Sequence, residues 1–143
     1  MILQIQKGKD NPILLKKSEA IKKIDQNILE LIENMTETMI KNQGIGLAAS
    51  QVGKNIRLFI LPKGLIKNYI FINPKILKMS KKMETMEEGC LSLSGIEIKI
   101  QRPESIKIKA TDEKNKQFKL KLKGLPARIF QHEIDHLDGK LIQ

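Results

Sequence analysis

The chain has 143 residues, which is enough for one domain with a full hydrophobic core but too few for two comfortable domains. We therefore expect a single domain over residues 1–143. Its net charge of +10 would suit nucleic acid, but lysines spread along the whole sequence and only 3% aromatic residues argue against a protein that binds specific nucleic acid. A single cysteine excludes an internal disulfide. The N-terminus lacks the long apolar run of a signal peptide or a membrane span. We therefore expect a cytoplasmic location.

The first helical pattern begins at Asp25, whose side chain suits a helix N-cap. Apolar residues recur at helical spacing through the next stretch, at positions 28, 29, 32, 35, 39 and 40. Gly44 follows as a typical C-terminal stop. These signals predict an N-terminal helix over Gln26–Asn42.

The middle of the chain is rich in residues that favour β-strands. Three of its stretches alternate apolar and polar residues, as strands with one buried face do. The polar segment Asp112–Lys116 predicts a hairpin loop between the last two strands. We expect strands at residues 56–61, 69–77, 96–100, 105–111 and 117–123.

A last helix is predicted close to the C-terminus. It should begin near Pro126, a residue favoured in the first turn of a helix, and end at Asp138–Gly139. With strands between two helices, the expected fold class is α+β, with antiparallel β-sheets around the C-terminal helix and an N-terminal helix before them.

Both histidines of the chain fall on this last helix, in the order His-Glu-Ile-Asp-His. His132 and His136 stand four residues apart, so their rings project from one face and can hold one metal ion. Glu133 lies beside them as a candidate base. The alternative is a pair of ordinary histidines near a helix C-terminus, where the helix dipole favours cations. Because this spacing arises rarely by chance, we interpret the segment as a metal-binding helix.

A catalytic metal needs a third protein ligand, and little sequence follows His136 to supply one. The one carboxylate there, Asp138, is too near to fold back easily. Upstream, Cys90 lies in Glu87–Gly95, where glycines permit close backbone approach and a thiolate suits a soft or borderline metal. A lone cysteine is more often a small buried hydrophobic residue. Beside an incomplete pair of histidines, we favour Cys90 as the third ligand.

The stretch Gly44–Gly53 combines three glycines and two alanines with a lone amide, Gln51. Small side chains let the backbone approach another group closely, and a buried glutamine needs hydrogen-bond partners. The alternative is a helix stop followed by a tight turn into a strand. A dinucleotide-binding loop is excluded, because the required glycine spacing fails at Ala49.

These three segments follow one another in a fixed order. They read G-I-G-L-A-A-S-Q at Gly44–Gln51, E-G-C-L-S at Glu88–Ser92 and H-E-I-D-H at His132–His136. In this order the chain resembles the peptide deformylase family, whose pattern all three segments match in full. The resemblance implies a metal-dependent hydrolase that removes the formyl group from the N-terminal formylmethionine of newly synthesised polypeptides and releases formate. The implied partners are N-formylmethionyl nascent peptides, with the ribosome surface as a further candidate and no membrane.

The resemblance also implies how the metal is held and used. Cys90, His132 and His136 would be its ligands. The metal would be Fe(II) in the cell, with zinc, nickel or cobalt as alternatives in purified protein. Glu133 would take a proton from the attacking water and later pass a proton to the leaving amine.

Further roles concern the oxyanion and the substrate. The side-chain amide of Gln51 and the backbone N–H of Leu91 would donate to the oxyanion, as the resemblance implies. Gly46 would offer its backbone to a substrate lying as an added strand. From their positions in the helix and loop, three apolar residues are expected to wall the pocket for the methionine side chain: Ile45, Leu125 and Ile129.

Two other functions fit parts of the pattern. A zinc metallopeptidase would cleave internal peptide bonds and would need a ligand other than Cys90. A basic binding module with a purely structural metal would need a fourth ligand, because structural zinc sites are closed.

Overall fold

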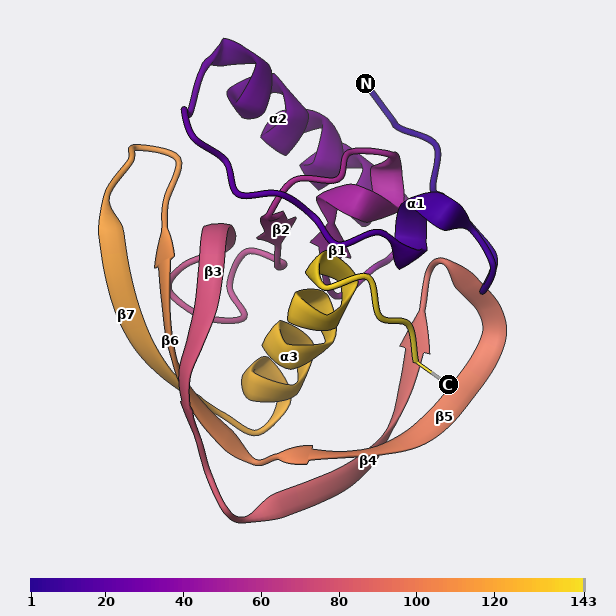
Figure 1. Ribbon diagram of the computed structural model, residues 1–143, viewed down its shortest axis with the longest axis vertical. Coiled ribbons are helices and arrows are strands. Elements are labelled where there is room, and N and C mark those ends of the chain that lie inside the picture. Colours follow the sequence, from indigo (N-terminus) through magenta and orange to yellow (C-terminus); the bar gives the residue numbers. More distant parts are fainter. Residues whose placement is uncertain (143) are drawn as a thin grey trace.

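The computed structural model describes residues 1–142 and has the predicted α+β fold with antiparallel sheets. Five strands form one sheet in the order β1-β2-β3-β6-β7, and β4 pairs with β5 in a second sheet of two strands. Figure 1 shows the strands curving around α3. The elements are α1 (Pro12–Leu15), α2 (Gln26–Lys41), β1 (Leu47–Ala48), the 3-10 helix η1 (Ala49–Val52), β2 (Leu58–Ile60), β3 (Ile70–Met79), β4 (Met83–Cys90), β5 (Leu93–Pro103), β6 (Ser105–Thr111), β7 (Gln117–Lys123) and α3 (Leu125–Leu137).

The core on the α3 side of the larger sheet buries three of the four phenylalanines of the chain, and the fourth, Phe118, packs against it. The ring of Phe130 in α3 meets the rings of Phe59 and Phe71, with centroids 4.9 and 5.4 Å away. All three side chains are fully buried, so they remove a large apolar area from water in a chain with few aromatic residues. This contact holds α3 against β2 and β3.

The other core joins α2 to the same strands. Leu58 and Ile60 of β2 pack with this core, whereas Phe59 between them packs with α3, as expected from the alternation of side chains along a strand. The carboxylate of Asp25 accepts a hydrogen bond from the Ile28 N–H at 3.1 Å, which confirms the predicted N-cap. The helix ends at Lys41, one residue before the predicted end.

The last helix begins and ends as predicted. Pro126 lies in its first turn, and Asp138 forms the C-cap. Gly139 follows with a φ of +74°, and a Cβ there would lie 2.5 Å from the carbonyl oxygen of Leu15. The glycine therefore permits both the backbone turn and the close approach of α1.

The predicted strands differ from the observed ones mainly in the two-stranded sheet. The sequence pattern gave no strand at Met83–Cys90, and it predicted only residues 96–100 of β5, which runs over Leu93–Pro103. Most side chains of β4 are exposed, so its sequence lacks the alternation that marks a strand with one buried face. Strand β3 also continues beyond residue 77 to Met79, and β2 is shorter than 56–61.

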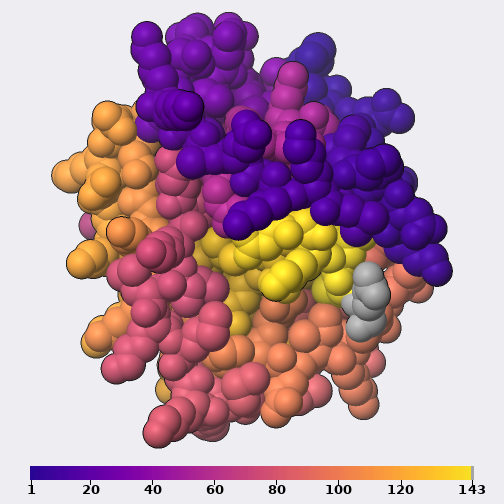
Figure 2. Space-filling model, viewed as in Figure 1, coloured from indigo at the N-terminus to yellow at the C-terminus, as the bar shows by residue number. Residues whose placement is uncertain are grey.

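Figure 2 shows the face of the molecule on which the N-terminal segment crosses above α3, with the strands below it. Within residues 1–142, no helix combines the length and the apolar character that crossing a lipid bilayer requires.

Candidate metal centre

Three potential metal ligands converge at the end of β4 and on α3. Cys90 Sγ lies 3.3 Å from His136 Nε2, and the Nε2 atoms of His132 and His136 are 3.2 Å apart. The three ligand atoms all lie within 4.8 Å of one another. A thiolate with two imidazoles forms a donor set that suits Fe(II), Zn(II) and related divalent ions, so the residues present fit a metal ion.

The position of Cys90 depends on an irregularity in the two-stranded sheet. Gly89 pairs with Glu97, but the next residue, Cys90, pairs with Leu93, which is a shift of register. Irregularities of this kind bend a strand and re-aim its side chains. Here the bend coincides with the point where the thiol meets the two histidines of α3.

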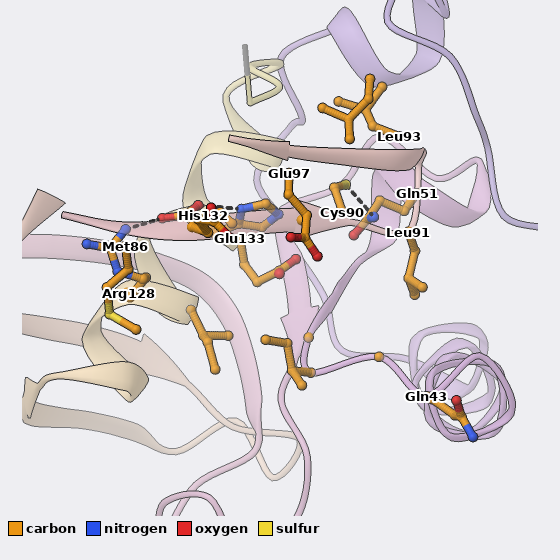
Figure 3. Close-up of a pocket in the computed structure, with 18 of the residues that line it drawn as sticks. Gln43, Gln51, Met86, Cys90, Leu91, Leu93, Glu97, Arg128, His132 and Glu133 are labelled. Atoms are coloured by element: carbon orange, nitrogen blue, oxygen red, sulfur yellow. Dashed lines mark hydrogen bonds and ion pairs between the residues drawn. The ribbon is translucent and has the colours of Figure 1, made fainter. Parts of the chain in front are cut away.

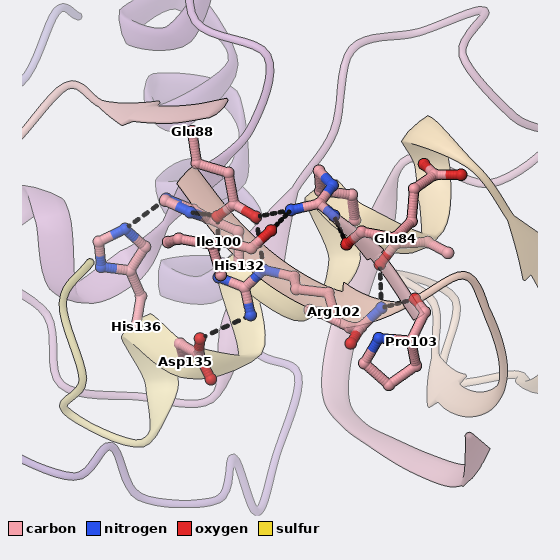
Figure 4. A network of polar contacts seen from close by, with 11 residues as sticks. Glu84, Glu88, Ile100, Arg102, Pro103, His132, Asp135 and His136 are labelled. Carbon is pink, nitrogen blue, oxygen red and sulfur yellow. Dashed lines mark hydrogen bonds and ion pairs between the residues drawn. The ribbon is translucent and has the colours of Figure 1, made fainter. Parts of the chain in front are cut away.

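The buried carboxylate of Glu88 contacts the ring nitrogen of His132 that is not among the three converging ligand atoms. His132 Nδ1 lies 2.9 Å from Glu88 Oε1, which leaves Nε2 free to face Cys90 and the metal position. Glu88 also accepts hydrogen bonds from Arg102 at 2.5 and 2.8 Å and from Arg128 at 2.5 Å. Figure 4 shows this network joining β4 and β5 to α3, with Asp135 as a further partner of Arg102.

The network keeps Glu88 charged. Burial by itself would raise the pKa of Glu88, but the hydrogen bonds from Arg102 and His132 outweigh it and lower the pKa to about 2. The carboxylate is therefore ionised at neutral pH and can orient the ring of His132. Sequence reasoning assigned no role to Glu88, Arg102 or Arg128; only the position of Glu88 inside the E-G-C-L-S segment hinted at one.

Glu133 lies beside the converging ligands and is almost completely buried, with 3% of its surface exposed. Burial raises its pKa to about 7, against the lowering effect of the neighbouring His132. Its Oε1 atom has no hydrogen-bond partner among the described residues. A buried carboxyl group with an unpaired oxygen and a pKa near neutrality is suited to exchange protons with a bound molecule.

The backbone of Gly46 passes directly over this carboxyl group. A Cβ at position 46 would lie 2.7 Å from Glu133 Oε2, a distance that real Cβ atoms essentially never show, and 3.2 Å from Ile129 Cγ2, which is tighter than most Cβ contacts. A larger residue just before β1 would therefore push the carboxyl group of Glu133 aside.

We expect that Gly46→Ala displaces Glu133 and lowers the rate of any reaction that uses this carboxyl group by tenfold or more, since a shift of about 1 Å can cost roughly a hundredfold. The metal content should stay unchanged, because Gly46 is not a ligand. Catalytic turnover and metal analysis on the same sample measure both effects. Full activity in the alanine variant would show that the close approach is not needed.

Gln51 is 2% exposed and is held at both ends of its side-chain amide. Its Oε1 accepts a hydrogen bond from the Ala48 N–H at 3.0 Å, and its Nε2 donates to Ser92 Oγ at 3.2 Å and lies 3.6 Å from Cys90 Sγ. The segment around it forms β1 and η1 rather than a simple tight turn. This local fold aims the amide nitrogen at Cys90, one of the three potential ligands.

A pocket of about 780 Å³ opens beside the three ligands. It contains every site residue that the sequence predicted except His136, which is 1% exposed and lies behind it. Ile129 is buried in its wall, whereas Ile45 and Leu125 are 62% and 46% exposed at its rim. Figure 3 shows further lining residues, of which sequence reasoning missed Met86 and Arg128.

A cysteine, two histidines and a neighbouring buried glutamate on an α+β fold are typical of the metal-dependent hydrolases as a class. The family model described as polypeptide deformylase matches residues 2–143. The chain therefore belongs to the peptide deformylase family.

Individual relatives agree with the family. The chain is 44% identical over 142 residues to a peptide deformylase of Dictyoglomus thermophilum, covering 99% of this chain and 91% of that protein. It is 44% identical over 135 residues to the chloroplastic/mitochondrial peptide deformylase 1B of Arabidopsis thaliana, covering 92% of this chain and 50% of that protein. The chain thus spans about half the length of the plant relatives. The crystal structure of peptide deformylase from Thermotoga maritima has a TM-score of 0.92 and 39% identity, covering 99% of this chain and 95% of that chain.

Proposed function

We propose that the protein removes the N-formyl group from the formylmethionine that begins newly synthesised polypeptides. The observation that carries this proposal is the meeting of Cys90, His132 and His136 beside a buried, unpaired carboxyl group at the wall of a 780 Å³ pocket. We also propose that residues 1–143 form a single domain and that the protein is located in the cytoplasm.

Cys90, His132 and His136 would hold the metal, which we propose to be Fe(II) in the cell, with zinc, nickel or cobalt as substitutes. A divalent ion there would act as a Lewis acid, which in metallohydrolases lowers the pKa of water from about 16 to about 7. Three protein ligands leave a position open, which favours a catalytic site over a closed structural one. Among the described residues, no fourth Cys, His, Asp or Glu joins the cluster.

Glu133 would act as the general base. Its buried position keeps bulk water away from the carboxyl group, and its pKa of about 7 lets it accept a proton near neutral pH. The same carboxyl group would then deliver a proton to the amine that leaves when formate departs. Glu88 would keep the ring of His132 in a fixed orientation during these steps.

Two donors are proposed for the negative charge that develops on the formyl oxygen. The Gln51 amide is preorganised by Ala48 and Ser92, so it needs little reorganisation when the charge appears. Leu91, whose backbone N–H is the second proposed donor, directly follows Cys90 and lines the pocket.

The substrate would lie along β1. This strand ends the order β1-β2-β3-β6-β7, so its outer edge can accept an extended peptide beginning at Gly46. Main-chain contacts of that kind bind peptides of any sequence. The methionine side chain would occupy the apolar part of the pocket, between Ile129 on α3 and the rim residues Ile45 and Leu125, with Met86 as an additional wall.

The proposed function is tested with two short peptides, one longer peptide and metal-loaded protein. We expect release of formate from formyl-Met-Ala-Ser, no cleavage of unformylated Met-Ala-Ser, and no cleavage of an internal bond in a longer peptide. Cleavage of internal bonds would instead assign the site to a metallopeptidase. Tight metal binding without any hydrolysis would assign it to a structural metal module.

We expect Gln51→Ala to lower kcat by roughly ten- to a thousandfold with little change in KM, because the amide matters most when charge develops on oxygen. Steady-state kinetics with a formyl-Met peptide provide the measurement. Metal analysis of the same protein is the control, since Gln51 Nε2 also lies near Cys90 Sγ. A change confined to KM would assign Gln51 to substrate binding.

A further inference from the structure

The lysines that are spread along the sequence gather on one face of the folded sheet. In the register of β3 with β6, Lys75 lies opposite Lys109 and Lys78 lies opposite Lys107. In the register of β6 with β7, Lys109 lies opposite Lys119 and Lys107 lies opposite Lys121. The result is two rows of three lysines across three strands. We call this set the lysine face: Lys75, Lys78, Lys107, Lys109, Lys119 and Lys121.

The lysine face points away from the core. Residues between the lysines, such as Ile106, Ile108 and Leu122, are buried in the core that contains α3. All six lysines are exposed. With adjacent strands about 4.8 Å apart and alternate residues about 7 Å apart, the backbone positions of the six lysines share an area of roughly 10 by 7 Å.

This arrangement costs stability. Like charges directly opposite each other on neighbouring strands destabilise a sheet. Among residues 1–142, none of the six lysines forms an ion pair; the nearby Glu104 pairs with Lys82 and Lys123 instead. The face therefore carries its charge uncompensated.

Protection of a free sheet edge does not account for the whole face. Lysines on the edge strand β7 would discourage pairing with other chains. Strand β6, however, is covered on both sides by β3 and β7, and Lys107 and Lys109 guard no edge. Their presence calls for another explanation.

A hollow of about 360 Å³ adjoins one row of the face. Lys78, Lys107 and Lys121 line it together with Lys123, which pairs with Glu104. Two serines and three apolar residues complete the lining: Ser80, Ser105, Met79, Ile106 and Leu122. The lysines of this row therefore border a recess in which a phosphate group would meet positive charge.

We propose that the lysine face binds the phosphate backbone of RNA without regard to base sequence. Flexible ammonium groups neutralise a repeating line of phosphates and release its counterions. The face offers no aromatic side chain for stacking and no arginine for bidentate recognition of a base, so it reads charge and not sequence. The face lies outside the pocket next to Cys90, so RNA binding is independent of the proposed deformylation.

The test uses the metal-loaded full chain and a fluorescent single-stranded oligouridylate, with binding measured from about 50 to 200 mM salt. In the test variant, Lys78, Lys107, Lys109 and Lys121 are replaced by glutamine. We expect the slope of log affinity against log salt to become shallower by about 3, because each lost phosphate contact on a single strand contributes about 0.7. Replacement of the same four residues by arginine should retain the wild-type slope.

The matched control removes the same charge elsewhere, through Lys7, Lys9, Lys17 and Lys41 to glutamine, all of which are exposed and precede β1. This control should keep a slope within about 1 of the wild-type value. Both variants should hydrolyse a short formyl-Met peptide at the wild-type rate, which shows that they are folded.

Three outcomes would overturn the proposal. Equal loss in both glutamine variants would show that only net charge matters. Binding to phosphatidylserine vesicles that depends on the face, without a matching effect on RNA, would assign the face to a membrane. Face-dependent binding of fluorescent polyglutamate, without a matching effect on oligouridylate binding, would assign it to an acidic protein.

Discussion

Replacing Glu133 with glutamine is expected to lower kcat for a formyl-Met peptide by a hundredfold or more, which is typical of the loss of a general base. The amide has nearly the same shape as the carboxylate but cannot accept the proton. Glu133 does not belong to the group of three ligand atoms within 4.8 Å, so the variant should still bind one metal ion per chain.

The measurement combines steady-state kinetics with metal analysis of the same preparation. Glu30→Gln provides the matched control, because Glu30 is an exposed carboxylate on α2, outside the pocket, and its loss should change neither quantity. Near-normal turnover in Glu133→Gln would remove Glu133 from the mechanism. Loss of the metal together with turnover would assign it a structural role instead.

Replacing Cys90 with alanine is expected to release the metal and abolish turnover. Two imidazoles remain, and a site with two protein ligands is weak compared with one that has three. The loss of metal affinity should exceed the roughly 10- to 100-fold that follows from removing a group that only hydrogen-bonds to a ligand. Dialysis against a graded series of chelator concentrations, followed by metal analysis, measures the change.

Two further variants serve as controls for Cys90→Ala. Ser94 lies in β5, four residues after Cys90, and is not one of the three candidate ligands, so Ser94→Ala should retain the metal. Glu88→Gln should weaken metal binding less than Cys90→Ala does, because Glu88 acts through His132 Nδ1. If Cys90→Ala retained one tightly bound ion per chain, Cys90 would not be a ligand.

Several elements could be predicted because their signals are local. Asp25 caps the first turn of α2, a contact between residues three positions apart. In β6 and β7, apolar and polar residues alternate because one face of each strand meets the core. Strand β4 could not be predicted in this way, because it pairs with β5 alone and exposes most of its side chains. A strand without a buried face leaves no alternation in its sequence.

The site shows the same division. The pairing of His132 with His136 is a consequence of helical spacing, and the structure places both on α3. The buried network of Glu88 with Arg102 and Arg128 left almost no signal, because charged residues in a sequence look alike whether they are solvated or buried. Only the fold reveals that these charges satisfy one another away from water.

By itself, the sequence determined the features that depend on neighbouring residues: the helix cap, the strand alternation and the common face of the two histidines. The tertiary structure decided which distant residues meet. Cys90 reaches His136 across 46 positions through the shifted register of β4 and β5, and dispersed lysines form one face through the registers of β3, β6 and β7. The physical reason is that the periodicity of a helix or strand is fixed by local backbone geometry, whereas strand register and packing depend on the burial of the whole chain.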